Sequence, residues 1–228
     1  MKKTLFVFIL AMCTFVSGAQ DFSYLMFRDW AGYNKYGDAN KTIMTAPKAV
    51  FLGDSIFEFW FNQDPAFFNT NNFLCRGIGG QTTCEILCRM RPDAIDLHPE
   101  FLVLMCGTND FAMNNGYISI EHSFGNLVSM CELAKVNGMK VLLCSVPPAT
   151  GFNWRPQVEP KDLVPILNRM LKDYAAKTDG VTYVDFFSAL AAPDNSMDPA
   201  NSDEGCHPNA TGYAKMKEII LKAMKNYK

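Results

Sequence analysis

Residues 49–55 read Ala-Val-Phe-Leu-Gly-Asp-Ser, so four apolar residues run directly into glycine, aspartate and serine. An apolar run without polar alternation is typical of a strand that is covered on both faces. The turn after it places the hydroxyl of Ser55 at the carboxyl end of that strand. Ligands of open α/β sheets bind beyond the carboxyl ends of the strands, so this stretch indicates a fold class and a place for chemistry.

Four further apolar runs follow the first, and helical patterns fill the intervals between them. The runs lie at 73–75, 101–105, 140–144 and 181–184. The intervening segments carry apolar residues at a spacing of three and four, as amphipathic helices do. Strand and helix therefore alternate through the chain, which predicts an α/β fold: a three-layer α/β/α sandwich around a five-stranded parallel sheet.

The first residues have the pattern of a targeting segment. Lys2 and Lys3 precede an apolar stretch at 5–16 that is too short to span a bilayer, and small residues follow at 17–19. We therefore predict a signal peptide at 1–19, cleavage near Ala19, and a secreted or periplasmic protein.

The remainder of the chain divides into a short arm and one domain. Segment 20–45 is rich in aromatic residues, and we expect it to pack as an N-terminal helical arm on a domain at 46–228. Without residues 1–19 the chain has 209 of its 228 residues, which is enough for one domain with a substantial core.

Charge excludes some partners. Two of the 21 Lys and Arg residues lie within 1–19, so 19 remain against 23 Asp and Glu, and no basic block occurs. Nucleic acids and anionic membrane surfaces are poor partners for such a chain, and no later stretch is long enough for a membrane span. The oligomeric state stays open.

The mature chain has an odd number of cysteines and no Cys-x-x-Cys pair. Several of them lie within apolar runs, where cysteine usually acts as a small buried hydrophobe. We interpret the thiols as mostly core residues and leave their redox state open. The seven are Cys75, Cys84, Cys88, Cys106, Cys131, Cys144 and Cys206.

Polar clusters follow the predicted strands and meet at one edge of the sheet. Ser55 follows the first strand, 77–82 follows the second, and 107–110 follows the third. Of the three histidines, His207 alone falls at this edge, in the loop after the fifth strand. A serine hydroxyl needs a base within hydrogen-bond reach to act as a nucleophile, and imidazole suits that task.

A serine–histidine pair needs two further kinds of group. The base needs an acceptor that fixes its tautomer, and Glu204 lies three residues before His207. The developing oxyanion needs donors, and the available ones are the backbone N–H groups of Ser55 and Gly80 and the side-chain amide of Asn109.

These clusters resemble the SGNH hydrolase family, also called GDSL esterases, in order and spacing. Gly53-Asp54-Ser55 is similar to its first block, 78–82 to its second, 107–110 to its third, and His207-Pro208-Asn209 to its last. The resemblance covers essentially the whole mature chain. It implies a flavodoxin-like sandwich, Ser55 as nucleophile, Gly80 and Asn109 as oxyanion donors, and no metal or organic cofactor.

One position departs from the family pattern. The family usually has aspartate three residues before the histidine, where this chain has Glu204 with Asp203 beside it. Glutamate serves in some hydrolase triads, so Glu204 is our choice, but Asp203 or a backbone carbonyl are alternatives. Asp54, Trp154 and Arg155 are candidates for substrate contact, with a sugar face on Trp154 or an acid at Arg155; a loop anchored by a buried Trp154 is the alternative.

We therefore expect a serine esterase that forms an acyl-Ser55 intermediate on a small ester, with acetyl groups of extracellular carbohydrate as the favoured substrate. A lysophospholipase or thioesterase acting on longer acyl chains is a second hypothesis. A catalytically inactive carbohydrate-binding protein is a third, because Glu204 departs from the family pattern.

Overall fold

The computed structural model describes residues 28–227 of the chain. The predicted signal peptide and residues 20–27 of the predicted arm lie outside the described residues. In chain order the elements are α2 (Gly37–Lys41), β1 (Ala49–Gly53), α3 (Ser55–Gln63), α4 (Pro65–Thr70), β2 (Phe73–Gly77), α5 (Thr83–Asp93), the 3-10 helix η1 (Ile95–Leu97), β3 (Phe101–Met105), α6 (Thr108–Phe111), α7 (Ile120–Val136), β4 (Lys140–Cys144), α8 (Pro160–Ala176), β5 (Val181–Val184), α9 (Phe187–Leu190) and α10 (Ala210–Lys225).

The five strands form one parallel sheet in the order β2-β1-β3-β4-β5, which confirms the predicted fold class. The chain leaves β1 toward one edge of the sheet and then returns to β3 on the other side of β1. This reversal makes the carboxyl end of β1 the switch point, where ligands of such sheets bind. In register, Gly53 at that end pairs with Gly77 of β2 and Met105 of β3.

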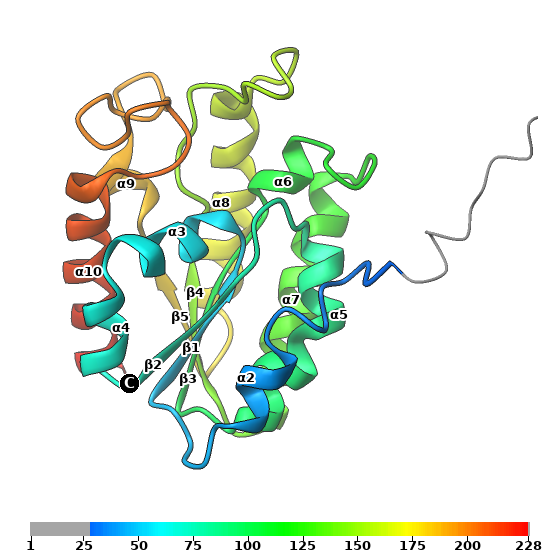
Figure 1. Ribbon diagram of the computed structural model, residues 1–228. Helices are drawn as coiled ribbons and strands as arrows, with labels where there is room; N and C mark the ends of the chain where they lie inside the picture. The colour runs from blue at the N-terminus through cyan, green and yellow to red at the C-terminus, as the bar shows by residue number, and fades with distance from the viewer. Residues whose placement is uncertain (1–27, 228) are drawn as a thin grey trace, which may run out of the picture.

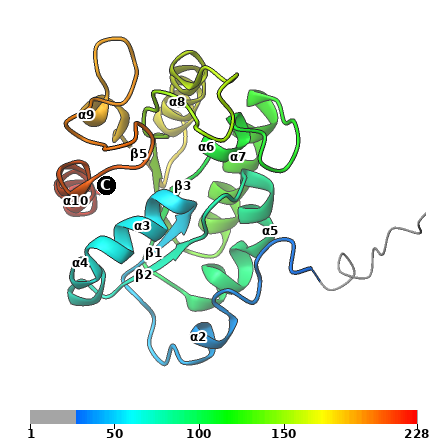
Figure 2. The same cartoon turned by 45° about the horizontal axis from the view of Figure 1, so that its top comes forward.

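Two hydrophobic cores lie on opposite faces of the sheet. Val50 and Leu52 of β1 belong to the core under α5, α7 and α8, whereas Ala49 and Phe51 belong to the core under α3, α4, α9 and α10. Figures 1 and 2 show these helices as two layers with the sheet between them. Burial on both faces explains why the strands read as continuous apolar runs.

Side chains at the carboxyl edge start the helices next to the predicted site. Asp54 caps α3 by accepting from the Ile56 N–H at 3.0 Å. Thr82 and Glu85 form a capping box at the start of α5, and Asn209 caps α10. Such caps satisfy N–H groups that lack a partner within the helix, so each helix begins at a fixed residue directly beside a site loop.

The described part of the arm, residues 28–45, consists of turns and the short helix α2. It packs beside α5, where the Asn40 side-chain amide donates to the Asp93 carboxylate at 2.8 Å and to the Pro92 carbonyl at 3.0 Å. Figure 1 shows this blue segment running along the α5 side of the sheet toward its carboxyl edge.

Five of the seven described cysteines are buried, Cys84 is partly buried and Cys88 is exposed, and all seven are free thiols. This agrees with the interpretation of most thiols as core residues. Within residues 28–227, no helix combines the length and the apolar character that crossing a bilayer requires.

Candidate active site

Ser55 is the first residue of α3, and only Asp54 separates it from the end of β1. Its Oγ lies 2.9 Å from His207 Nε2, although the two residues are 152 positions apart in the sequence. The sheet edge and the loop that leads into α10 together produce this contact. A serine oxygen at hydrogen-bond distance from an imidazole nitrogen is the arrangement that nucleophilic catalysis by serine requires.

His207 is oriented by Glu204. Glu204 Oε1 lies 2.9 Å from His207 Nδ1, and the same oxygen accepts from the His207 backbone N–H and, at 3.3 Å, from the Cys206 backbone N–H. Asp203 is engaged elsewhere, since it accepts from the Asn209 amide at 3.2 Å. Of the two neighbouring acids, Glu204 is the one that contacts the imidazole.

The Phe59 ring packs against the His207 ring. Phe59 lies one turn after Ser55 on α3, and its ring centroid is 4.8 Å from that of His207. Sequence reasoning missed Phe59, because only the spacing of four residues on a helix places it beside Ser55, and many core residues share that spacing.

The second half of the site, which we call the donor side, consists of Gly80, Asn109 and Asn114. Gly80 has φ +79°, in the left-handed region that favours glycine, and lies in the loop between β2 and α5. Asn109 lies in α6, where its Nδ2 donates to the Gln81 carbonyl at 3.0 Å. Asn114 donates to Asn109 Oδ1 at 2.7 Å and to the Gly80 carbonyl at 3.2 Å. The Asn109 amide is therefore fixed at both ends, its oxygen by Asn114 and its nitrogen by the Gln81 carbonyl.

Sequence reasoning also missed Asn114. It directly precedes another asparagine, Asn115, and nothing in the spacing distinguishes the two. Only the path of the loop after α6 brings Asn114 back over Asn109.

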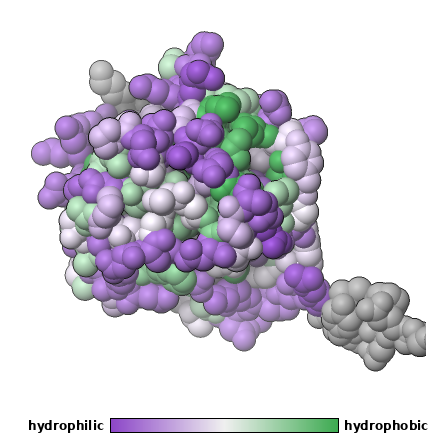
Figure 3. Space-filling view, turned by 90° about the horizontal axis from the view of Figure 1, so that it is seen from above, coloured by the Kyte–Doolittle hydropathy of each residue, from purple (hydrophilic) through white to green (hydrophobic). Residues whose placement is uncertain are grey.

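A pocket of about 310 Å³ connects these groups. One wall is Trp154, whose indole N–H donates to Asn114 Oδ1 at 2.8 Å and whose side chain is partly exposed. The lining residues are Ser55, Phe59, Gly79, Gly80, Asn109, Asn114, Trp154 and His207. Figure 3 looks onto this end of the molecule, where most of the surface is hydrophilic.

Two of the predicted substrate contacts need correction. Asp54 is fully buried, and it caps α3 instead of facing the pocket. Arg155 donates through Nε to the Ala112 carbonyl at 3.1 Å and does not line the catalytic pocket, so it holds the loop in place. Arg155 was predicted as a contact because its loop follows the fourth strand at the active edge of the sheet.

Burial changes the chemistry of the carboxyls beneath the site. It raises the pKa of Asp54 to about 7, and the Asp54 Oδ2 atom has no hydrogen-bond partner among the described residues. Burial also raises the pKa of Asp110, which accepts from the Thr83 and Ser123 hydroxyls at 2.6 and 2.8 Å.

Glu204, Cys206 and His207 bring three atoms of metal-ligand type within 4.8 Å of one another. Metal ligation needs a thiolate, and burial raises the pKa of the Cys206 thiol, which disfavours that form. The Glu204 and His207 atoms already contact each other. The donor set therefore suits a hydrogen-bonded pair better than a metal.

The chain belongs to the GDSL-like lipase/acylhydrolase family, whose model matches residues 51–215. A proposed acylhydrolase from Bacteroides fragilis NCTC 9343 has a similar crystal structure, with 38% sequence identity and a TM-score of 0.83 over 87% of this chain and 98% of that chain. A GDSL-like lipase from Bacteroides thetaiotaomicron VPI-5482 has 36% identity and a TM-score of 0.82 over 86% and 98% of the two chains. The protein is thus a hydrolase that acts on esters.

Among curated proteins, an acetylxylan esterase from Xylanibacter ruminicola is 27% identical over 154 residues, which are 58% of this chain and 30% of the relative. The chain spans 16 to 35% of the length of the curated relatives that it matches.

Proposed function

We propose that the protein is a serine esterase that removes short acyl groups, most favourably acetyl, from carbohydrate. The observation that carries the proposal is the continuous line from Ser55 Oγ through the His207 imidazole to Glu204, with 2.9 Å at each contact, beside a pocket that contains amide donors.

In the first half-reaction, Ser55 Oγ attacks the ester carbonyl carbon while its proton passes to His207 Nε2. The oxyanion of the tetrahedral intermediate accepts hydrogen bonds from the Ser55 and Gly80 N–H groups and from Asn109 Nδ2. The intermediate then collapses: its bond to the alcohol oxygen breaks, His207 returns the proton to that oxygen, and acyl-Ser55 remains.

In the second half-reaction, water repeats the attack. His207 takes a proton from the water, whose oxygen bonds to the acyl carbon, and collapse of the second tetrahedral intermediate breaks the bond to Ser55 Oγ. Ser55 recovers its proton from His207, and a short carboxylic acid leaves. Glu204 stabilises the imidazolium that forms in both halves.

Two observations favour a short acyl group on a sugar. The catalytic pocket is small, and the partly exposed indole of Trp154 offers the flat apolar face on which a sugar ring packs. The curated relatives named acetylxylan esterase and multidomain esterase are consistent with this substrate class. The predicted signal peptide at 1–19 supports a secreted or periplasmic location, where polymeric carbohydrate is accessible, with the catalytic domain at 46–228.

A longer acyl chain is the second candidate, because a larger apolar pocket of about 440 Å³ lies nearby between the loop after α6 and the start of α8. Figure 3 shows a hydrophobic area at this end of the molecule. However, that pocket and the catalytic pocket have no lining residue in common, so an acyl chain on Ser55 would have to cross the wall between them.

Hydrolysis of p-nitrophenyl acetate by wild type and Ser55→Ala tests the mechanism. We expect kcat/KM to fall by at least about 10³-fold in Ser55→Ala, and to stay unchanged in Ser188→Ala, which alters an exposed serine in α9. A Ser55→Ala protein with full activity would exclude the mechanism. An inactive wild type would instead favour the carbohydrate-binding hypothesis.

A substrate panel tests the substrate class. We expect the rate to fall from C2 to C8 p-nitrophenyl esters, whereas a steep rise would favour the longer-chain hypothesis. Trp154→Ala should raise KM for acetylated xylooligosaccharides by about 3- to 10-fold and leave KM for ethyl acetate unchanged, because ethyl acetate has no ring to pack on the indole.

A further inference from the structure

We infer that the N-terminal arm, through Lys35 and Tyr36, and Glu58 of α3 are positioning residues that hold the Gly80 N–H in the geometry of an oxyanion donor. The inference rests on the proposed function, since it presumes that Gly80 serves the reaction at Ser55. The family match begins at residue 51, so the arm lies before the segment that the family shares. The loop at issue is Gly77–Gln81, which we call the donor loop.

Glu58 connects the arm to the donor loop. Its Oε2 accepts from the Gly79 backbone N–H at 2.7 Å, and its Oε1 accepts from Lys35 Nζ at 3.0 Å. The Ile78–Gly79 peptide group, one before the peptide group that carries the Gly80 N–H, is thus held by a carboxylate acceptor, and the lysine holds that acceptor in place. Hydrogen bonds to charged groups are about twice as strong as neutral ones.

Two more contacts join the arm to the ends of the donor loop. The Tyr36 hydroxyl donates to the Gly77 carbonyl, and the Gln81 side-chain amide donates to the Ala31 carbonyl at 2.7 Å. Burial raises the pKa of Tyr36, which keeps its hydroxyl protonated and able to donate. Gly32 allows the close approach, because a Cβ there would lie 2.9 Å from the Gln81 amide nitrogen.

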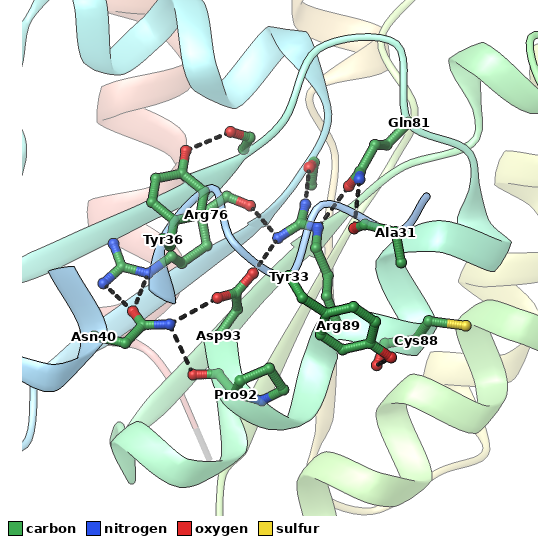
Figure 4. A network of polar contacts seen from close by, with 12 residues as sticks. Ala31, Tyr33, Tyr36, Asn40, Arg76, Gln81, Cys88, Arg89, Pro92 and Asp93 are labelled. Carbon is green, nitrogen blue, oxygen red and sulfur yellow. Dashed lines mark hydrogen bonds and ion pairs between the residues drawn. The ribbon is translucent and has the colours of Figure 1, made fainter. Parts of the chain in front are cut away.

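Arg89 of α5 supports the same loop from within the protein. Its guanidinium is fully buried and donates to Gln81 Oε1 and to the carbonyls of Arg76 and Gly53. Figure 4 shows Tyr36 and Arg89 on either side of the chain around Arg76, with Gln81 between Arg89 and Ala31. The strand ends that carry the nucleophile and the donor loop are therefore connected through one guanidinium.

The N–H groups on either side of Gly80 in the donor loop have acceptors, and the Gly80 N–H has none among residues 28–227. In the donor loop, the Ile78 N–H donates to the Gly53 carbonyl at 3.1 Å, the Gly79 N–H to Glu58, and the Gln81 N–H to the Ile78 carbonyl at 3.4 Å. Within the described part of the chain, Gly80 N–H has no such acceptor and belongs to a residue that lines the catalytic pocket. Fixed neighbours and a free N–H are what a preorganised oxyanion donor requires.

Steady-state kinetics with p-nitrophenyl acetate test the inference. In Glu58→Ala we expect kcat to fall by about 10- to 100-fold with KM within about twofold of wild type. A displaced Gly80 N–H would weaken the hydrogen bond to the oxyanion, and that charge develops only in the transition state. Glu58→Gln keeps an oxygen for the Gly79 N–H, and we expect it to recover most of kcat. Lys35→Ala and Tyr36→Phe should each lower kcat by about 3- to 10-fold. Lys41→Ala, on the same arm but paired with the exposed Asp38, is the matched control and should not change kcat.

The outcomes separate the inference from the proposed function. A kcat for Glu58→Ala within twofold of wild type, or no recovery in Glu58→Gln, would overturn the inference. If Glu58→Ala does not fold, unchanged kcat values in both Lys35→Ala and Tyr36→Phe would overturn it. Full activity in Ser55→Ala would overturn the proposed function itself, whereas an inactive Ser55→Ala beside a fully active Glu58→Ala would overturn the inference alone.

Discussion

Each side of the candidate site contains a side-chain contact of the same length, and this contact is buried on one side and exposed on the other. Arg89 and Asp93, beneath the donor loop, lie 2.9 Å apart and neither side chain is exposed at all. His207 and Glu204, on the loop before α10, also lie 2.9 Å apart, but 21% and 40% of their side chains are exposed. The Arg89–Asp93 pair thus lies within the protein, whereas the His207–Glu204 pair lies near the surface.

The distance between two side chains alone does not determine what their contact contributes. A buried ion pair costs desolvation, and removing one partner leaves an uncompensated charge, so its loss appears mainly in stability. An exposed pair contributes little to stability, and in the proposed mechanism the role of Glu204 is to orient the base. We therefore expect substitutions in the buried Arg89–Asp93 pair to act on folding first and substitutions in the exposed Glu204–His207 pair to act mainly on rate.

Arg89→Met should give the largest effect. It removes the cation that faces the buried Asp93 carboxylate and one donor from each of three other buried oxygens, and we expect a loss of about 3–5 kcal/mol in the free energy of unfolding. Urea denaturation measures it. Arg91→Met is the matched control on the same helix, because Arg91 is exposed and 3.7 Å from Asp96, and we expect a change below about 1 kcal/mol. Equal losses of unfolding free energy in the two variants would contradict the expectation that the buried ion pair matters more for stability than the exposed one.

Glu204→Gln should give the next effect, on rate. The amide cannot stabilise the imidazolium as a carboxylate does, so we expect kcat/KM to fall by about 10²- to 10³-fold. The free energy of unfolding should change by less than about 1 kcal/mol, because the contact is exposed. Asp203→Asn is the control, since Asp203 contacts Asn209 instead of His207. A larger loss of rate in Asp203→Asn than in Glu204→Gln would show that the other acid serves the base.

The fold was predictable because its strands are covered on both faces. Five apolar runs mark the five strands, and the chain order of strands and helices fixes parallel pairing. The rule that ligands bind beyond the carboxyl ends of strands then selected Ser55, Gly80 and Asn109, and it selected His207 from only three histidines. These four residues line one pocket.

The rest of the site depends on loop paths, which sequence spacing does not determine. Asn114 contacts the Asn109 side chain and the Gly80 carbonyl, and Glu58 contacts the Gly79 N–H and Lys35. The sequence does not distinguish either residue from other polar residues nearby. The prediction of Asp54 as a substrate contact was wrong, because its oxygen accepts from the Ile56 N–H at the start of α3. The proposed role of the arm in positioning the donor loop depends on the contact of Lys35 with Glu58, which is 23 positions away in the sequence.

Asp54→Asn should give the smallest effect, a change in how the free energy of unfolding depends on pH. Burial raises the pKa of Asp54 from 3.8 to about 7, so the folded protein holds this proton more tightly than the unfolded chain does. The carboxyl's contribution to stability is complete below about pH 4 and is lost as the pH rises, with the loss complete above about 7.

Asparagine keeps the oxygen that caps α3 and has no charge to bury. The free energy of unfolding should therefore fall less between pH 5 and pH 8 in Asp54→Asn than in wild type, by about 2–3 kcal/mol. Asp64→Asn is the control. Asp64 also caps a helix, but its hydrogen bond with Lys217 lowers its pKa, so its contribution is lost only below about pH 4 and the slope from pH 5 to 8 should match wild type. A wild-type slope in Asp54→Asn would mean that Asp54 is ionised throughout this range, and that the polar network around Arg89 stabilises its charge despite complete burial.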